Sequence, residues 1–347
     1  MPVTVDEGRV PSSWSSRRPH PQQALANASG PRPAPIKIAL VNNMPDSALE
    51  DTELQFCELL EGAAGDLPVR VLLFSLPELP RNERGKHHIN QFYSTFTELL
   101  ESRFDGAIVT GTEPIQPDLK NEPYWGSLVE LLGWAEENTS STVLSCLAAH
   151  AGVLHSDAIT RNRLPDKQFG VFAHERAADH ILTRGIPNTV HIPHSRWNEV
   201  REEELVAHGY TVLTKSADAG VDLFIKEKKK SLFVHFQGHP EYGRLTLLKE
   251  YQRDIRRFLK RERATYPSMP AGYFDSNATE VLGAFREGVS RNPDPGGMET
   301  FPEPGVVNSL QNSWRDSAVG IYRNWLNYLI SRKSGSEIES LARAGRN

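Results

Sequence analysis

From Ile36 onward, the chain alternates short apolar runs with amphipathic segments, and no other feature of the sequence constrains the fold as strongly. The apolar runs have the length and aliphatic content of buried strands, which we expect at 36–41, 69–76, 106–111 and 141–146. The segments between them have helical periodicity, and we expect helices at 50–63, 87–104, 124–138 and from Leu147 onward. Strands that alternate with helices in this way form a parallel sheet covered on both faces. The sequence therefore predicts the α/β class, with a doubly wound, mostly parallel sheet flanked by helices in a three-layer sandwich.

After this region the pattern changes to strand-like pieces separated by turns, followed by helices. Further strands are expected at 169–175, 189–195, 210–215, 221–228 and 231–239, and helices at 246–264 and 320–332. Residues 266–305 are rich in Pro, Gly and Asn, which is typical of turns, so we expect a loop laid over the domain.

Composition divides the chain into four expected segments. Residues 1–35 are rich in Ser, Pro and Arg and lack an apolar period, so we expect a disordered N-terminal arm. Residues 36–265 form the predicted α/β domain, and residues 266–332 a C-terminal extension packed on it. Residues 333–347 are expected to be a flexible tail.

Charge and cysteine content narrow the class of protein. The net charge of −5 gives no electrostatic reason to expect a nucleic acid or an anionic membrane as a partner. The apolar runs fall well short of the roughly 20 residues that span a bilayer. Two cysteines cannot build a disulfide framework, and they suggest a reducing compartment. We therefore expect a soluble, cytoplasmic protein.

Cys146 stands where the strand 141–146 meets a run of small residues that opens a helix. This arrangement predicts a nucleophile elbow, with sulfur in place of a serine oxygen. The positive end of the helix dipole lowers the pKa of a thiol placed there. The backbone N–H of Leu147 would be one oxyanion donor, and the loop at Gly111 and Thr112 a second, since glycine permits an unusual backbone conformation. Taken alone, the stretch also fits a buried structural cysteine.

The stretch FQGHPEY, residues 236–242, also ends an apolar strand. In a doubly wound sheet, catalytic groups collect at the carboxyl ends of the strands. We expect His239 to take the proton of the thiol and Glu241 to fix the tautomer of the imidazole. Cysteine, histidine and acid in this order indicate a catalytic triad.

Several motifs make the chain resemble the homoserine O-acyltransferases of the homoserine O-succinyltransferase (MetA) type. These enzymes belong to the class I glutamine amidotransferase-like superfamily, whose fold is a flavodoxin-like three-layer sandwich. The resemblance covers roughly residues 36–264, and its motifs are LVNNMPDSALEDTELQF, FDGAIVTG, EPYW, LPDKQFGVFAHE, PHSRWNEVR, GHPEY and EYQRD.

The resemblance implies a function and site residues. It implies transfer of a succinyl or acetyl group from acyl-CoA to the hydroxyl of homoserine or a related amino acid, in methionine biosynthesis. Cys146 would carry the acyl group as a thioester, His239 would be the general base, and Glu241 its orienting acid. It implies that the acceptor is surrounded by Lys167, Ser195 and Arg253. Succinyl-CoA or acetyl-CoA would be a cosubstrate without a bound cofactor, all substrates would be small molecules, and a homodimer is possible.

Two departures from the family pattern leave the acyl donor open. The family usually has Trp-Gly-Ala-Gln after the cysteine, whereas this chain has Leu-Ala-Ala-His, in which we expect His150 to have a packing role. The resemblance also places Ile115 at the position linked to acyl-donor choice. Isoleucine narrows a pocket without adding charge, so it selects neither the succinyl nor the acetyl donor.

Two other functions stay open for this chain. The same triad fits an amide hydrolase of the glutamine amidotransferase type, and the altered elbow fits a non-catalytic relative that binds an amino acid or a partner protein. A metal site is not expected, because the pairs His191 and His194, and His235 and His239, have no third ligand in a zinc pattern. We expect Cys57 to be a core residue.

Overall fold

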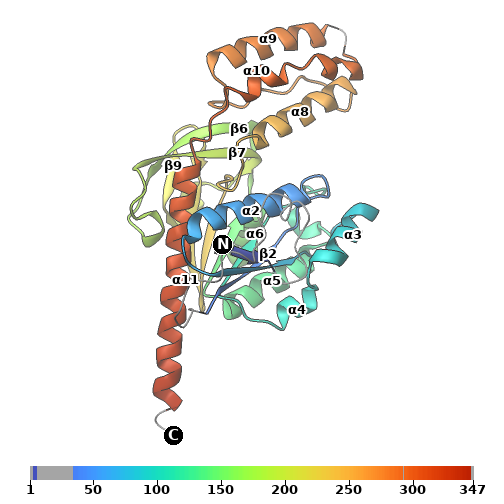
Figure 1. Cartoon of the computed structure of the whole chain (residues 1–347). Helices are drawn as coiled ribbons and strands as arrows, with labels where there is room; N and C mark the ends of the chain where they lie inside the picture. The colour runs from blue at the N-terminus through green and yellow to red at the C-terminus, as the bar shows by residue number, and fades with distance from the viewer. Residues whose placement is uncertain (1–2, 6–33, 292, 345–347) are drawn as a thin grey trace, which may run out of the picture.

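The computed structural model describes residues 3–5, 34–291 and 293–344, with side chains described as far as residue 334. The strands of its main sheet lie in the order β1-β3-β2-β4-β5-β12-β11-β8 (Figure 1). In that order they are β1 (Val3–Val5), β3 (Val69–Phe74), β2 (Ile36–Val41), β4 (Gly106–Val109), β5 (Ser141–Ser145), β12 (Ser231–Phe236), β11 (Leu223–Lys228) and β8 (Thr211–Val212).

The order of the parallel strands identifies the fold. From β3 to β12 the neighbours are parallel, and numbering only these five strands along the chain gives 2-1-3-4-5. This is the doubly wound order of flavodoxin-like sheets. The strands β11 and β8 extend the sheet by antiparallel pairing. The predicted class, a mostly parallel sheet flanked by helices, is confirmed.

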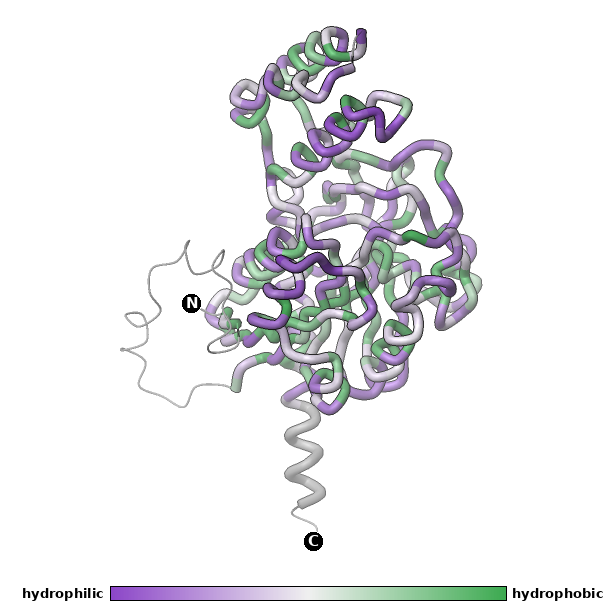
Figure 2. Tube along the Cα trace, turned by 90° about the vertical axis from the view of Figure 1, so that its right-hand side faces the viewer, coloured by the Kyte–Doolittle hydropathy of each residue, from purple (hydrophilic) through white to green (hydrophobic). Residues whose placement is uncertain are grey.

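Helices cover both faces of the main sheet. On one face, α2 (Leu49–Ala64) and α11 (Arg315–Ala344) lie against the apolar side chains of β1, β2, β3 and β12. On the other face lie α5 (Trp125–Asn138) and α6 (Leu147–Asp157). Figure 2 shows hydrophobic segments gathered in the interior of the sheet region. Because both faces are buried, most residues of the central strands are apolar, as in other parallel sheets.

One predicted helix is wrong. Residues 87–104 form two helices, α3 (Glu83–Phe92) and α4 (Phe96–Leu100), rather than one. Thr95 caps α4, and with Glu98 it forms a capping box that satisfies backbone groups at the start of that helix. The chain is extended at Tyr93, and the N–H of Ser94 donates to the carbonyl of Leu73. Capping and a contact with β3 therefore override the helical periodicity.

A second, smaller sheet stands beside the main one, with the strand order β10-β9-β6-β7. Its strands are β10 (Gly220–Val221), β9 (Thr214–Ser216), β6 (Asn162–Arg176) and β7 (Thr189–Glu199). The short helix α7 (Glu202–Ala207) follows β7. The expected strand at 210–215 is divided between the two sheets, as β8 and β9. The backbone N–H of His239 donates to the carbonyl of Pro193 in β7, so this sheet reaches the region that follows β12.

The C-terminal region is more helical than the sequence predicts. The expected loop at 266–305 contains α9 (Ser276–Ser290) and the start of α10 (Glu303–Val307). Asp275 caps α9, whose apolar side chains pack with those of α8 (Thr246–Leu259). Figure 1 shows α8, α9 and α10 together at one end of the molecule. Proline and glycine in this stretch therefore do not prevent helices, and Gly283 and Gly288 lie within α9 itself.

Both ends of the chain also differ from expectation. Val3–Val5, within the arm expected to be disordered, forms β1 and pairs with Val69–Val71 of β3, while residues 1–2 and 6–33 lie outside the described residues. The last helix, expected at 320–332, is α11, which continues to Ala344 into the expected flexible tail; residues 345–347 lie outside the description. The division of the chain into four segments stays a prediction.

Three short 3-10 helices complete the set of helices in the part of the chain that the structure describes. The 3-10 helices are η2 (Leu119–Asn121), η3 (Ile181–Thr183) and η4 (Pro295–Thr300). Among the helices of the described residues, none combines the length and the apolar character that crossing a membrane requires.

The packing of Trp325 in α11 allows the contribution of the C-terminal helix to stability to be tested by substitution. Its indole is almost fully buried and donates a hydrogen bond to the hydroxyl of Ser141 at 2.9 Å. We expect Trp325→Ala to lower the free energy of unfolding by about 3–5 kcal/mol, because it leaves a large cavity. Urea unfolding measures the change, and Asn327→Ala, at an exposed position of the same helix, is the control. Equal stabilities of the two variants would contradict the packing of α11 on the sheet.

Candidate active site

Cys146 occupies a strained turn between β5 and α6. Its backbone has φ 52° and ψ −112°, a left-handed conformation that residues other than glycine rarely adopt. The N–H of Cys146 donates to the carbonyl of Phe236 at the end of β12, which holds the turn in place. Cys146 is partly exposed, whereas Cys57 is buried in the core as expected. Strain of this kind is typical of a nucleophile elbow.

Gly111 lies against the start of α6, and the predicted reason for a glycine there is wrong. Gly111 is not among the residues with positive φ. Instead, a Cβ atom at this position would lie 2.9 Å from the Cβ and 3.0 Å from the N atom of Leu147. The absence of a side chain therefore leaves the N–H of Leu147, the first residue of α6, uncovered, and such N–H groups have no partner within their helix. The oxyanion roles of Leu147, Gly111 and Thr112 stay predictions.

Parallel pairing of β5 and β12 brings the predicted triad together. Ser145 and Phe236 are opposite each other in the register, so Cys146 and the turn that carries His239 start side by side. His239 Nδ1 and Glu241 Oε1 are 2.8 Å apart, and both side chains are buried. The Nδ1–H donates to the carboxylate, and the ring interacts electrostatically with Cys146. The structure thus places Cys146 at the end of the strand next to the one that leads to His239 and Glu241.

The electrostatics of His239 depend on its two neighbours. Burial by itself lowers the pKa of His239, because an imidazolium loses its hydration in the interior. Interactions with Cys146 and Glu241 outweigh this effect and raise the pKa of His239 well above its usual value. At neutral pH the imidazole therefore holds a proton next to the sulfur atom of Cys146. Such a pair contains both a nucleophile and a proton donor for a leaving group.

Asp222, which the sequence analysis did not identify, fixes the chain before His239. Its Oδ1 atom accepts the N–H of Gly238 at 2.8 Å, and its carbonyl accepts the N–H of Gln237. The side chain is fully buried, and this burial raises the pKa of Asp222. In the sequence, Asp222 is a single aspartate near the start of an expected strand. Nothing in that position indicates that it holds the backbone before His239.

His150 has the packing role that the sequence predicts. It is buried, and its Nε2 atom lies 3.0 Å from Oε1 of Gln237. Burial lowers the pKa of His150 to about 3, so this ring is neutral at physiological pH. It contributes a hydrogen bond between α6 and the end of β12.

The three residues expected around the acceptor meet at one carboxylate, that of Glu250 in α8. The Nζ atom of Lys167 lies 3.3 Å from Oε2 of Glu250, and the Ser195 hydroxyl donates to the same oxygen. An Nη2 atom of Arg253 lies 3.6 Å from it. Lys167 and Arg253 also contact Asp254. The sequence analysis missed Glu250, although it stands first in the motif EYQRD, because a single glutamate on an amphipathic helix resembles a solvated one.

The charge of Glu250 is maintained by these neighbours. Burial by itself raises the pKa of a carboxyl group, but Lys167, followed by hydrogen bonds from Ser195 and Tyr242, lowers the pKa of Glu250 below its usual value. A partly buried carboxylate with two cations provides complementary charges for a ligand that carries both an ammonium and a carboxylate group.

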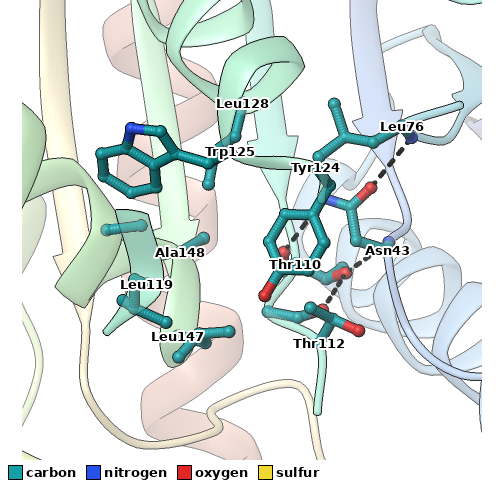
Figure 3. A pocket seen from close by; sticks show the side chains of 12 residues that line it. Asn43, Leu76, Thr110, Thr112, Leu119, Tyr124, Trp125, Leu128, Leu147 and Ala148 are labelled. Carbon is teal, nitrogen blue, oxygen red and sulfur yellow. Dashed lines mark hydrogen bonds between the residues drawn. The ribbon is translucent and has the colours of Figure 1, made fainter. Parts of the chain in front are cut away.

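A mostly apolar pocket lies next to the elbow (Figure 3). Leu147 and Ala148 line one side, and Thr112, Tyr124 and Trp125 line others. The hydroxyl of Tyr124 is buried and has no hydrogen-bond partner within the described residues. The pocket therefore combines an apolar wall with polar groups close to the first turn of α6.

Ile115 does not line this pocket. It lies in the loop after β4 with 67% of its surface exposed, and its N–H donates to Oε1 of Glu122. Its side chain therefore does not narrow the pocket as expected. The role of Ile115 in acyl-donor choice stays a prediction.

The histidines considered for a metal site have other contacts. Among the described residues, His, Cys, Asp and Glu side chains nowhere gather in a group of three that could hold a metal ion. His191 is exposed, while His194 is buried with its Nε2 atom 3.2 Å from that of His174. The Nε–H of Arg196 donates to Nδ1 of His194, so the Nε2–H of His194 donates to His174.

A family match and two similar proteins all point to the same family. The family described as "HTS: Homoserine O-succinyltransferase" matches residues 23–336. A homoserine O-succinyltransferase of Rhodopseudomonas palustris is 44% identical over 296 residues, which cover 85% of this chain and 89% of that protein. One of Bradyrhizobium japonicum is 42% identical over 311 residues, covering 88% of this chain and 95% of the relative.

Solved structures with a similar fold are more distant in sequence. A glutamine amidotransferase from Thermotoga maritima is 11% identical, covers 85% of this chain and 98% of its own, and has a TM-score of 0.44. The fold assignment rests on the strand order of the main sheet. By the family match and by its identity to these relatives, the chain belongs to the homoserine O-succinyltransferase family, the acyltransferases of methionine biosynthesis.

Proposed function

We propose that this protein transfers a succinyl group from succinyl-CoA to the hydroxyl of homoserine, through a thioester on Cys146. The observation that carries the proposal is the strained elbow at Cys146, next to the buried His239 and Glu241 pair. A backbone strained at one partly exposed cysteine is difficult to explain as packing. The cytoplasm, as a reducing compartment, would keep this thiol free.

In the first half-reaction, the acyl group moves from the sulfur of CoA to the sulfur of Cys146, and His239 supplies a proton. The thiolate attacks the carbonyl carbon of the acyl-CoA, and the N–H groups at Leu147 and at Gly111 or Thr112 stabilise the oxyanion. The bond between the carbonyl carbon and the CoA sulfur then breaks, and the CoA thiolate leaves with the proton from His239. The raised pKa of His239 supports this step, because the proton is present before the acyl donor binds.

In the second half-reaction, the acceptor hydroxyl takes the place of the CoA sulfur. His239 Nε2 removes the hydroxyl proton while the oxygen attacks the thioester, and the Cys146 thiolate is released. Glu241 stabilises the imidazolium that forms, through the contact at Nδ1. The enzyme then returns to its starting protonation state.

The charges around Glu250 support an amino acid as the acceptor. The acceptor ammonium would bind Glu250, and its carboxylate would bind Arg253 and Lys167, which hold Glu250 in its absence. Ser195 lies two residues after Pro193, whose carbonyl accepts the N–H of His239, so β7 connects this cluster with the triad. Both charged ends of an amino acid would thus be bound next to the general base.

A cation near the elbow supports the succinyl donor. Arg161 interacts electrostatically with Tyr124, which lines the pocket, with Glu122 and, to a smaller extent, with Cys146. A succinyl group carries a free carboxylate that this guanidinium would balance, whereas an acetyl group carries none. The charge of Arg161 therefore favours succinyl-CoA over acetyl-CoA, a choice that the identity of Ile115 does not decide.

Mass spectrometry of the intact protein tests the function directly. Mixing with succinyl-CoA should add one succinyl group at Cys146, and adding homoserine should remove it. Acetyl-CoA compares the two donors, and Cys57 is an internal control because it is buried. A folded sample that forms no adduct with either donor contradicts the proposal. Ammonia release from glutamine without CoA would indicate an amide hydrolase on the same triad instead.

A further inference from the structure

Tyr242 touches both the general base and the acceptor carboxylate. Its ring stacks on the imidazole of His239, with ring centroids 4.2 Å apart and planes 17° from parallel. Its hydroxyl donates to Oε1 of Glu250 at 2.7 Å. The other oxygen of Glu250 is the one that faces Ser195, Lys167 and Arg253. One rigid side chain therefore spans the two parts of the site.

The surroundings hold Tyr242 in this position. Its backbone N–H donates to the carbonyl of His239, and its own carbonyl accepts the indole N–H of Trp314 at 2.7 Å. The side chain is buried. Burial and the adjacent Glu250 carboxylate raise the pKa of Tyr242 well above its usual value. The hydroxyl consequently keeps its proton and remains a hydrogen-bond donor to Glu250.

We propose that Tyr242 is a positioning residue of the second half-reaction, fixing Glu250 relative to His239. An acceptor whose ammonium binds Glu250 then has its hydroxyl within reach of the imidazole. Tyr242 transfers no proton and acts through Glu250. The inference rests on the proposed function, in which Glu250 binds the acceptor.

The two half-reactions allow this role to be separated from a general structural one. The first half-reaction uses Cys146 and His239 but not Glu250, so it does not need the Tyr242 hydroxyl. The second half-reaction uses Cys146, His239 and Glu250. Tyr242→Phe keeps the ring that stacks on His239 and removes only the hydrogen bond to Glu250.

We expect Tyr242→Phe to acylate Cys146 at the wild-type rate but to need more homoserine for deacylation. The KM for homoserine should rise about tenfold, because a hydrogen bond to a charged group is lost, with a smaller change in kcat. Rapid-quench mass spectrometry with succinyl-CoA measures acylation, and the decay of the adduct at increasing homoserine concentration measures deacylation. Tyr266→Phe is the control, since its ring packs on Phe258 at the other end of α8.

A second variant keeps the inference testable if the first also changes the fold. Glu250→Gln keeps an acceptor for the Tyr242 hydroxyl but loses the charge, and its combination with Tyr242→Phe should cost less than the product of the single effects. Independent effects in this cycle, an equal fall of both half-reactions, or an unchanged KM would overturn the inference. A wild-type protein that forms no acyl adduct would instead contradict the proposed function itself.

Discussion

Replacing Cys146 by alanine is expected to abolish the acyl adduct and to lower kcat by at least about 10⁴-fold, because no other group can carry the acyl chain. The structure gives the reason for so large an effect. The strained backbone of Cys146, the N–H of Leu147 beside Gly111 and the imidazole of His239, to which the proposed function gives the catalytic roles, all serve one sulfur atom. CoA release from succinyl-CoA, followed with a thiol reagent, measures the loss.

Cys57→Ala is the matched control for this experiment. Cys57 is buried in α2 against the opposite face of the sheet, so its loss should leave the adduct unchanged. Cys146→Ser should retain the fold while remaining far slower than the wild type, since a serine hydroxyl is protonated at neutral pH. An acyl adduct on a residue other than Cys146 would contradict the assignment.

Replacing His239 by asparagine is expected to lower kcat/KM by about 10²–10⁴-fold, the usual contribution of a general base. It should also change how alkylation of Cys146 by iodoacetamide depends on pH. In the wild type, the imidazole of His239 is protonated next to the sulfur of Cys146, because the pKa of His239 is raised well above its usual value. The positive charge that favours the thiolate is absent in the variant. Alkylation should therefore require a higher pH than in the wild type.

His191→Asn is the control, because His191 is exposed on β7. It should leave both kcat/KM and the alkylation profile unchanged. An identical alkylation profile in His239→Asn and the wild type would mean that the imidazole and the sulfur do not interact in solution.

Much of the main sheet could be predicted from the sequence for a physical reason. Strands buried on both faces are mostly apolar, as IKIALV at 36–41 and LFVHF at 232–236 are, and the helices between them are amphipathic. The errors arose where local chemistry or a distant contact decided the outcome. Thr95 divides one expected helix by capping, and Val3–Val5 is a strand only because β3 offers it an edge.

The candidate site divides in the same way. Cys146 and His239 are visible in the sequence because each follows an apolar strand. Lys167, Ser195 and Arg253 came from the resemblance to a family, since each alone looks like a surface residue. Asp222, Tyr242 and Glu250 were missed, and their roles depend on partners that fold next to them.

The sequence by itself determined the α/β class, the position of the elbow and the family, because these depend on the order and periodicity of residues along the chain. Only the tertiary structure decided that β5 and β12 are neighbours and that four side chains from β6, β7, the β12–α8 turn and α8 meet at Glu250. The physical reason is that hydrogen bonds and ion pairs act over a few ångströms in space, while the residues that form them lie up to 83 positions apart in the chain.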